Sequence, residues 1–245
     1  MKKILSVIMM MALGVTNIAA DENTTVEEIG TVEVEIAGVK VSKNDSGTTI
    51  KADLNTTLSF GFIGGVAQDK DVSIDMGQSY EIEWGDVISG KVRVGKKDFV
   101  RLGLGFDWRN YRVTDFKRFA KDGRGIITME DYPDGVEPKF SRIHTFSLSI
   151  PLKFYHYFNK KMYFAVGPEL YFTPYGSLKT RYYVNGEKQK ISSGNVHQNR
   201  FSVGIGAEIN IHHIGIYYKY NPFNVLRSSY GPEFSSMTTG IKVAL

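Results

Sequence analysis

The segment FSVGIGAEINI, residues 201–211, alternates between two kinds of side chain. One parity is apolar and the other is small or polar, as in Val203 and Ile205 against Gly204 and Gly206. Successive side chains of a β-strand point to opposite faces of a sheet. The segment is therefore predicted to be a strand with one apolar face and one polar face.

The same alternation recurs throughout residues 56–245. The eight expected strands are residues 56–66, 79–95, 99–114, 140–155, 162–174, 196–211, 213–221 and 235–245. The connections at 96–98, 156–161 and 212 are short, whereas those at 67–78, 115–139, 175–195 and 222–234 are long. Short turns on one side and long loops on the other are typical of membrane β-barrels. The sequence predicts an all-β fold, an eight-stranded antiparallel up-and-down transmembrane barrel.

The polar parity indicates which face would meet lipid. A soluble barrel has its apolar face inside and its charged face in water. Here the polar parity is rich in glycine, which makes room for large neighbours in a narrow lumen. We therefore expect the apolar face outside. Unpaired buried charges are costly, so the lumen should hold a charge network made of Lys91, Arg93, Arg101, Asp107, Arg109, Lys153, Glu169, Glu208, Lys219 and Lys242.

Aromatic residues are expected at the two edges of the apolar band. A strand tilted by about 40° climbs roughly 2.6 Å per residue, so Trp108 should lie about 23 Å above Phe99. That height matches an apolar band of roughly 25 Å. The expected girdle residues are Trp84, Trp108, Phe154, Phe172, Tyr218 and Tyr220. Asp86 falls on the apolar parity, and a β-bulge near Gly85 would turn it inward.

Two segments precede the expected barrel. Residues 1–20 begin with Lys2 and Lys3, continue with an apolar run over 4–15, and end in Ala19-Ala20, which predicts a cleaved export signal. Residues 21–55 open with acidic side chains. Segments 31–41 and 48–54 are expected to form a short periplasmic hairpin around the turn-like sequence Asn44-Asp45-Ser46-Gly47.

Composition excludes several kinds of function. The chain contains no cysteine, which excludes disulfides and thiolate chemistry. No basic patch interleaved with stacking aromatics is present, so nucleic acid is not an expected partner. His156, His212 and His213 are too scattered to form a supported metal site, and no cofactor or metal is expected.

Cations gather in two of the long connections. The second holds Lys117, Arg118, Lys121 and Arg124, and the third holds Lys179 and Arg181, with Lys188 and Lys190 nearby. Such side chains make charge-assisted contacts with phosphate, which suggests contact with lipopolysaccharide. The alternative is a solvated loop whose cations are balanced by Asp122, Glu130 and Asp131.

The leader, the eight alternating segments and the final GIKVAL of residues 240–245 resemble small outer-membrane β-barrel proteins, the OmpA/OmpX-like, porin-family class. The resemblance implies that the outer-membrane insertion machinery reads the last strand during assembly, and that function lies in the external loops. We expect a non-enzymatic structural or surface-interaction role, such as envelope integrity, adhesion or lipopolysaccharide contact.

Two alternatives to this role stay open. The first is a narrow porin-like channel for small solutes or ions. The second is a lipid A-modifying hydrolase, for which His144 or His197 would act with Ser141, Ser147, Ser192 or Ser193.

Overall fold

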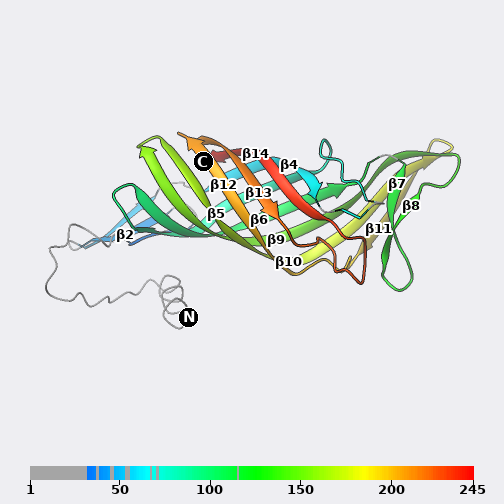
Figure 1. Cartoon of the computed structure of the whole chain (residues 1–245), viewed down its shortest axis with the longest axis horizontal. Helices are drawn as coiled ribbons and strands as arrows, with labels where there is room; N and C mark the ends of the chain where they lie inside the picture. The colour runs from blue at the N-terminus through cyan, green and yellow to red at the C-terminus, as the bar shows by residue number, and fades with distance from the viewer. Residues whose placement is uncertain are drawn as a thin grey trace.

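The computed structural model describes residues 32–36, 39–44, 47–52, 56–66, 68–69, 72–114 and 116–245, so the expected export signal lies outside the described residues. Eight antiparallel strands run in the order β5-β4-β14-β13-β12-β10-β9-β6, and the β5–β6 pair closes the barrel (Figure 1). The described residues include no helix that could cross a membrane. The barrel strands are β4 (Thr57–Val66), β5 (Tyr80–Arg93), β6 (Asp98–Arg112), β9 (Val136–Asn159), β10 (Met162–Val184), β12 (Phe201–Ile211), β13 (Ile214–Asn221) and β14 (Ser235–Ala244).

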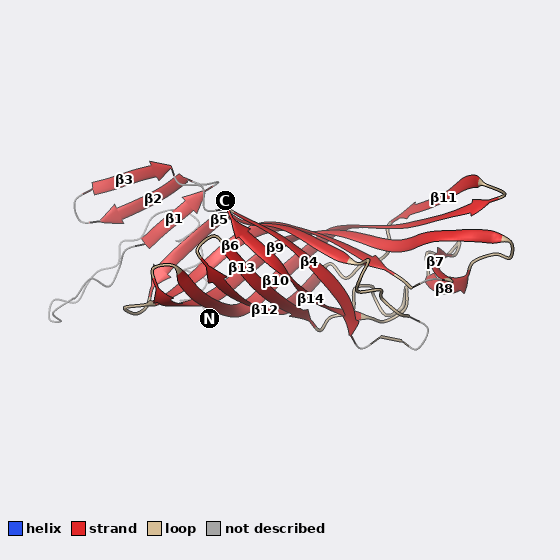
Figure 2. Cartoon of the chain, turned by 90° about the horizontal axis from the view of Figure 1, so that it is seen from above, coloured by secondary structure: helices blue, strands red, loops and turns tan. Residues whose placement is uncertain are grey.

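These eight strands confirm the predicted fold class, and their ends differ most in β9 and β10. Both run well past the predicted limits of 155 and 174, and β10 returns as β11 (Glu187–Gly194). The predicted strand end at 174 was therefore wrong, and most of the connection predicted at 175–195 is a strand hairpin. Asn185 and Gly186 both have positive φ, 50° and 80°, which is the geometry of a two-residue hairpin turn. Figure 2 shows β9, β10 and β11 protruding beyond the other strands.

The second long connection also contains regular structure. β7 (Lys117–Lys121) and β8 (Ile127–Asp131) form a hairpin there. Phe119 donates its backbone N–H to Ser141 Oγ, so the hairpin packs on the buried side of β9. We call the end with the long connections the upper end, and the end with the short turns the lower end.

The barrel wall has an apolar outer face. Ile205 and Ile216 are 57% and 65% exposed, whereas Glu208 and Lys219 of the same strands are 2% and 4% exposed. The two parities of a strand therefore face opposite environments, as the alternation predicts. Burying charge while leaving isoleucine exposed is the reverse of a water-soluble barrel, and it suits an outer surface in contact with lipid.

The predicted bulge near Gly85 is present. The β5–β6 register shifts between Trp84 and Ile88, and Asp86 adopts a φ of 55°. The shift turns the Asp86 carboxylate inward, where it lies 3.4 Å from Arg101 and is buried. The extra residue thus places a charge inside the barrel that strict alternation would place in lipid.

The segment before the barrel forms three strands, where the sequence predicted two. β1 (Val32–Ile36), β2 (Val39–Asn44) and β3 (Gly47–Ala52) form an antiparallel meander, because the expected strand at 31–41 is split into two. β1 pairs with residues 88–92 of β5, below the part of β5 that pairs with β4. Figure 2 places these strands at the opposite end of the molecule from β11.

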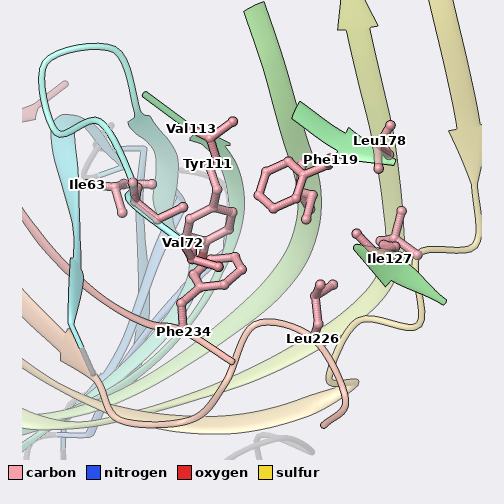
Figure 3. Close-up of a cluster of buried hydrophobic side chains, with 12 residues drawn as sticks. Ile63, Val72, Tyr111, Val113, Phe119, Ile127, Leu178, Leu226 and Phe234 are labelled. Atoms are coloured by element: carbon pink, nitrogen blue, oxygen red, sulfur yellow. The ribbon is translucent and has the colours of Figure 1, made fainter. Parts of the chain in front are cut away.

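An apolar core fills the upper end (Figure 3). It joins upper strand residues such as Tyr111, Ile143 and Leu178 to loop residues such as Val72 and Phe234. The buried side chains are Ile63, Val72, Ile74, Tyr111, Val113, Phe119, Ile127, Ile143, Leu178, Val196, Leu226 and Phe234. The long connections therefore fold together as a cap over the lumen.

Candidate functional site

Ion pairs connect the charges inside the barrel into one network. Lys219 Nζ lies 2.9 Å from a carboxylate oxygen of both Glu81 and Glu83, and 3.7 Å from Glu169. Lys153 Nζ links Glu169, at 2.7 Å, to Glu208, at 2.9 Å. Lys219 of β13 thus reaches β5 across the lumen, whereas Lys153 of β9 joins the neighbouring β10 to β12.

Two further cations complete the network. Arg109 lies 2.9 Å from Glu81 and 3.0 Å from Asp107, and Lys242 lies 2.6 Å from Glu208. Hydroxyl groups add hydrogen bonds: Tyr171 donates to Glu169, and Tyr217 donates to Glu81. The network contains the five carboxylates of Glu81, Glu83, Asp107, Glu169 and Glu208 against the four cations of Arg109, Lys153, Lys219 and Lys242.

Glycine makes room for this network. A Cβ on Gly206 would collide with the Glu169 carboxylate and would approach Lys153 Cε at 3.4 Å. A Cβ on Gly61 would collide with the Tyr217 hydroxyl. The glycines on the polar parity therefore provide the space in which long charged side chains meet.

The structure brings together seven of the ten predicted lumen charges. Asp107, Arg109, Lys153, Glu169, Glu208, Lys219 and Lys242 are all buried in the network. The other three lie lower on the same parity.

Arg101 pairs with Asp86 below the network. Lys91 and Arg93 are not part of the buried set: Lys91 is half-buried and Arg93 is exposed, and both cations lie over the Phe99 ring. Both belong to the lower end of β5, where the burial of the polar parity decreases.

Sequence reasoning missed Glu81 and Glu83. Both share the polar parity of β5 and alternate with the exposed Ile82 and Trp84. The alternation of apolar and polar residues within 79–95 places both side chains on the lumen face, and it could have identified them.

A second group of cations lies on the outer face of the protruding sheet. Arg112 of β6, Arg142 of β9 and Arg181 of β10 place their guanidinium groups 5.7, 5.2 and 5.1 Å from the centre of the Phe140 ring. Strand register explains the convergence: Arg112 is opposite Arg142, and Phe140 is opposite Arg181. Cations over an aromatic face are attracted to its quadrupole, so the ring holds the three groups in place.

Lysines extend this group along β10 and β11. Lys179 is opposite Arg142, and Lys190 is opposite Arg181. Desolvation, together with the charges of Lys190, Arg142, Arg181 and Lys188, lowers the pKa of Lys179. We call the set of Phe140, Arg112, Arg142, Lys179, Arg181 and Lys190 the Phe140 face. No carboxylate among the described residues lies within ion-pair distance of its five cations.

The Phe140 face lies directly above an aromatic cluster. Phe106, Trp108 and Phe146 contact one another on the outer surface of β6 and β9. Arg142 follows the outward parity four residues above Phe146, a rise of roughly 10 Å at 2.6 Å per residue. If Phe146 lies at the upper edge of the apolar band, these cations lie at the height of lipid headgroups.

The other predicted girdle residues also lie on the outer surface. Trp84, Phe154 and Tyr218 are exposed, and Trp84 contacts Phe106. Phe172 and Tyr220 are half-buried, and Phe172 contacts the exposed Phe201. Phe154 pairs with Val100 near the lower end of β6, so it belongs to the lower edge of the band.

The six predicted phosphate-contact residues fall into two groups. Lys179 and Arg181 belong to the Phe140 face, but Lys117, Arg118, Lys121 and Arg124 belong to the β7–β8 hairpin on the opposite side of β9. Arg118 pairs with Glu130 at 2.9 Å, and Lys121 donates to the carbonyl oxygens of Gly194 and Asn195. The six residues therefore do not share one surface, and their contact with phosphate stays a prediction.

The residues considered for hydrolysis do not assemble into a nucleophile and a base. His144 faces outward against Tyr175, whereas Ser141 and Ser147 face inward and bond to Thr180 and Thr173. Burial and the Arg142 charge lower the pKa of His144. Within the described ranges, no serine hydroxyl bonds to His144 or His197, and no cluster of His, Asp and Glu could hold a metal.

Comparisons with known proteins give a sparse result. No protein-family model matches the chain, and no curated protein matches it. Among solved structures, the chain is similar to Ail, the attachment invasion locus protein of Yersinia pestis, with 10% identity and a TM-score of 0.34 over 78% of this chain and 97% of that chain. The strand pairing itself shows the fold, which is a closed eight-stranded antiparallel barrel.

Proposed function

We propose that this chain is an integral outer-membrane protein with a structural and surface-interaction role, which holds lipopolysaccharide phosphates on the Phe140 face. One observation carries the proposal: five cations, none of them paired with a described carboxylate, stand on a sheet directly above the aromatic edge of an apolar wall. Export by residues 1–20 is part of the proposal and agrees with this location.

The chemistry of the face suits phosphate. A guanidinium donates two parallel hydrogen bonds to a phosphate, and such charge-assisted bonds are roughly twice as strong as neutral ones. Arg112, Arg142 and Arg181 are already held near one ring, so less side-chain freedom is lost on binding. A flat strand surface also lets several lipid headgroups approach side by side.

The interior favours a structural role over a channel. Charges from seven strands fill the lumen, and the apolar cap covers the upper end. Between the two, near Arg109 and Tyr111, a cavity of about 20 Å³ remains, which is room for about one water. An ion path would need the paired charges to separate, and this is costly in a buried site.

The test measures binding of the full chain, refolded in detergent, to vesicles that contain lipopolysaccharide. The double variant Arg142→Gln/Arg181→Gln should bind about tenfold more weakly, a loss of about 1.4 kcal/mol. The control Lys160→Gln/Lys161→Gln removes two exposed charges from the lower turn and should bind as the parent does. Equal binding by all three proteins would reject the proposal, and conductance steps in planar bilayers would favour the channel.

A further inference from the structure

A recessed cleft lies beside the upper part of β10, separate from the Phe140 face. Its volume is about 220 Å³, and its lining includes Tyr175, His197, Gln198, Arg200 and Arg227. One water needs only about 10–15 Å³ of such space, so the cleft can take a ligand much larger than a single water. None of the functions considered from the sequence used Arg200 or Arg227.

Two loop segments build the cleft against a bulge in β10. The β9–β10 register shifts between Phe172 and Tyr175, where the sequence has Pro174, a residue without a backbone N–H. Asn199 donates its N–H to the Val225 carbonyl, and Arg227 donates its N–H to the His197 carbonyl. The segment before β12 and the segment before β14 therefore pair with each other, which sets Arg200 and Arg227 on neighbouring runs of backbone.

Close packing and an unusual backbone conformation constrain the wall of the cleft. Gly176 leaves no space for a side chain, because a Cβ there would lie 2.6 Å from Val196 Cγ2. His197 has a φ of 51°, which side-chain-bearing residues rarely adopt, and its ring stacks on Tyr230 with centroids 3.9 Å apart. Unusual backbone conformations of this kind persist where the surrounding structure holds them, and they are frequent at ligand sites.

The charge of the lining points to an anion. The cleft contains two guanidinium groups, an imidazole and two amides, and its lining contains no carboxylate. No described carboxylate pairs with Arg200 or Arg227. Two arginines at one cleft match the oxygens of a phosphate monoester better than they match a lone carboxylate, which offers fewer acceptors.

The position of the cleft indicates where the ligand comes from. Arg200 immediately precedes Phe201, which is 70% exposed and whose ring lies 5.0 Å from that of Phe172 on the apolar wall. Tyr175 is also exposed and lines the cleft. A headgroup whose acyl chains lie along Phe201 would reach Arg200, while space beyond the phosphate would accept part of a sugar ring.

We propose that this cleft binds a sugar phosphate monoester presented by the headgroup of lipopolysaccharide, with Arg200 and Arg227 as the phosphate ligands. The source of the ligand rests on the proposed function, because both place the chain in the outer leaflet. Recognition of the sugar phosphate does not rest on the proposed function, because it can be tested with a soluble compound in the absence of a membrane. The Phe140 face lies on an outer strand surface, whereas this cleft is recessed and can select for the sugar.

The first arm of the test uses soluble compounds. The full chain in lipopolysaccharide-free detergent is titrated by calorimetry with glucosamine 1-phosphate, glucosamine and inorganic phosphate. Glucosamine 1-phosphate should bind at least tenfold more tightly than either of the others. Arg200→Gln/Arg227→Gln should lose that preference, and Arg142→Gln/Arg181→Gln should keep it. Equal binding of the three compounds, or a preference that survives in Arg200→Gln/Arg227→Gln, would overturn the site.

The second arm identifies the source. Vesicles with lipopolysaccharide and vesicles with phosphatidylglycerol are compared for the same variants. Arg200→Gln/Arg227→Gln should weaken binding only to the lipopolysaccharide vesicles. If Arg200→Gln/Arg227→Gln lost glucosamine 1-phosphate binding but bound the vesicles as the parent does, lipopolysaccharide would not be the source of the ligand. If only Arg142→Gln/Arg181→Gln bound the vesicles more weakly, the proposed function would stand and the lipid source would be overturned. Heat-modifiable migration on gels checks that every variant is folded.

Discussion

The lumen and the Phe140 face both collect cations, but their surroundings are opposite. In the lumen, Arg109 and Lys219 are buried and each lies within 3.0 Å of two carboxylates. On the Phe140 face, Arg142 and Arg181 stand on the outer surface over the Phe140 ring, and neither pairs with a described carboxylate. Arg109 and Arg112 are three residues apart on one strand, so parity and height decide which role a cation takes. Lumen charges are internal cross-links, and the outer charges are available to a ligand.

Loss of the central lumen cation should give the largest effect. Lys219→Met would leave Glu81 and Glu83 buried without their shared partner. Breaking a buried pair in this way costs about 3–5 kcal/mol. The free energy of unfolding by urea in lipid vesicles measures the loss. Arg124→Met, which removes an exposed loop charge, should change it by less than about 0.5 kcal/mol.

Loss of two outer arginines should leave stability unchanged and affect binding instead. Arg142→Gln/Arg181→Gln should unfold at the same urea concentration as the parent, yet bind lipopolysaccharide vesicles about tenfold more weakly. Salt sharpens the contrast, because screening weakens exposed charges much more than buried pairs. Raising salt should therefore reduce vesicle binding and leave the unfolding midpoint of the parent almost constant. A variant that loses both properties together would contradict the division of roles.

Loss of the aromatic ring of Phe140 should weaken vesicle binding less than loss of the two arginines does. Phe140→Leu keeps an apolar side chain of similar size but removes the quadrupole under three guanidinium groups. Exposed cation–π contacts contribute about 0.5–1 kcal/mol, so vesicle binding should weaken by about two- to fivefold. A change as large as that of Arg142→Gln/Arg181→Gln would show that Phe140 itself contacts the ligand.

The smallest effect on the free energy of unfolding is expected for Asp107, because the lumen network contains one more carboxylate than it has cations. Asp107 Oδ1 has no hydrogen-bond partner, and Arg109 would keep Glu81 if Asp107 became neutral. Asp107→Asn should therefore change the free energy of unfolding by less than about 1 kcal/mol. Glu81→Gln, which weakens pairs with both Arg109 and Lys219, should cost about 3 kcal/mol. If Asp107→Asn and Glu81→Gln lowered the free energy of unfolding equally, Asp107 would not be the surplus carboxylate of the network.

The barrel could be predicted because alternation reports a local property. Each of the eight strands separates two environments, so residues such as Ile205 and Glu208 already indicate the outer and inner faces. The same parity correctly required a bulge for Asp86. It also selected Lys219, which meets Glu81 and Glu83 across the lumen although they are far apart in the chain.

The Phe140 face and the Arg200–Arg227 cleft could not be predicted in the same way. Above the apolar band the outward parity of β9 and β10 carries His144, Arg142 and Lys179, so the apolar signal stops while the strands continue. The face depends on the register of four strands, and the cleft depends on the pairing of two loops. A single sequence does not specify either kind of long-range register.

Lipid accessibility of the outer parity tests the account most directly. The chain has no cysteine, so single nitroxide labels at Ile216→Cys and Ile241→Cys report on unique positions when the refolded protein is in vesicles. Both labels should collide readily with oxygen, which concentrates in hydrocarbon, and rarely with a water-soluble nickel chelate. A label at Lys160→Cys in the lower turn should show the reverse. Ready access of the nickel chelate to labels at 216 and 241 would contradict a barrel whose apolar wall faces lipid.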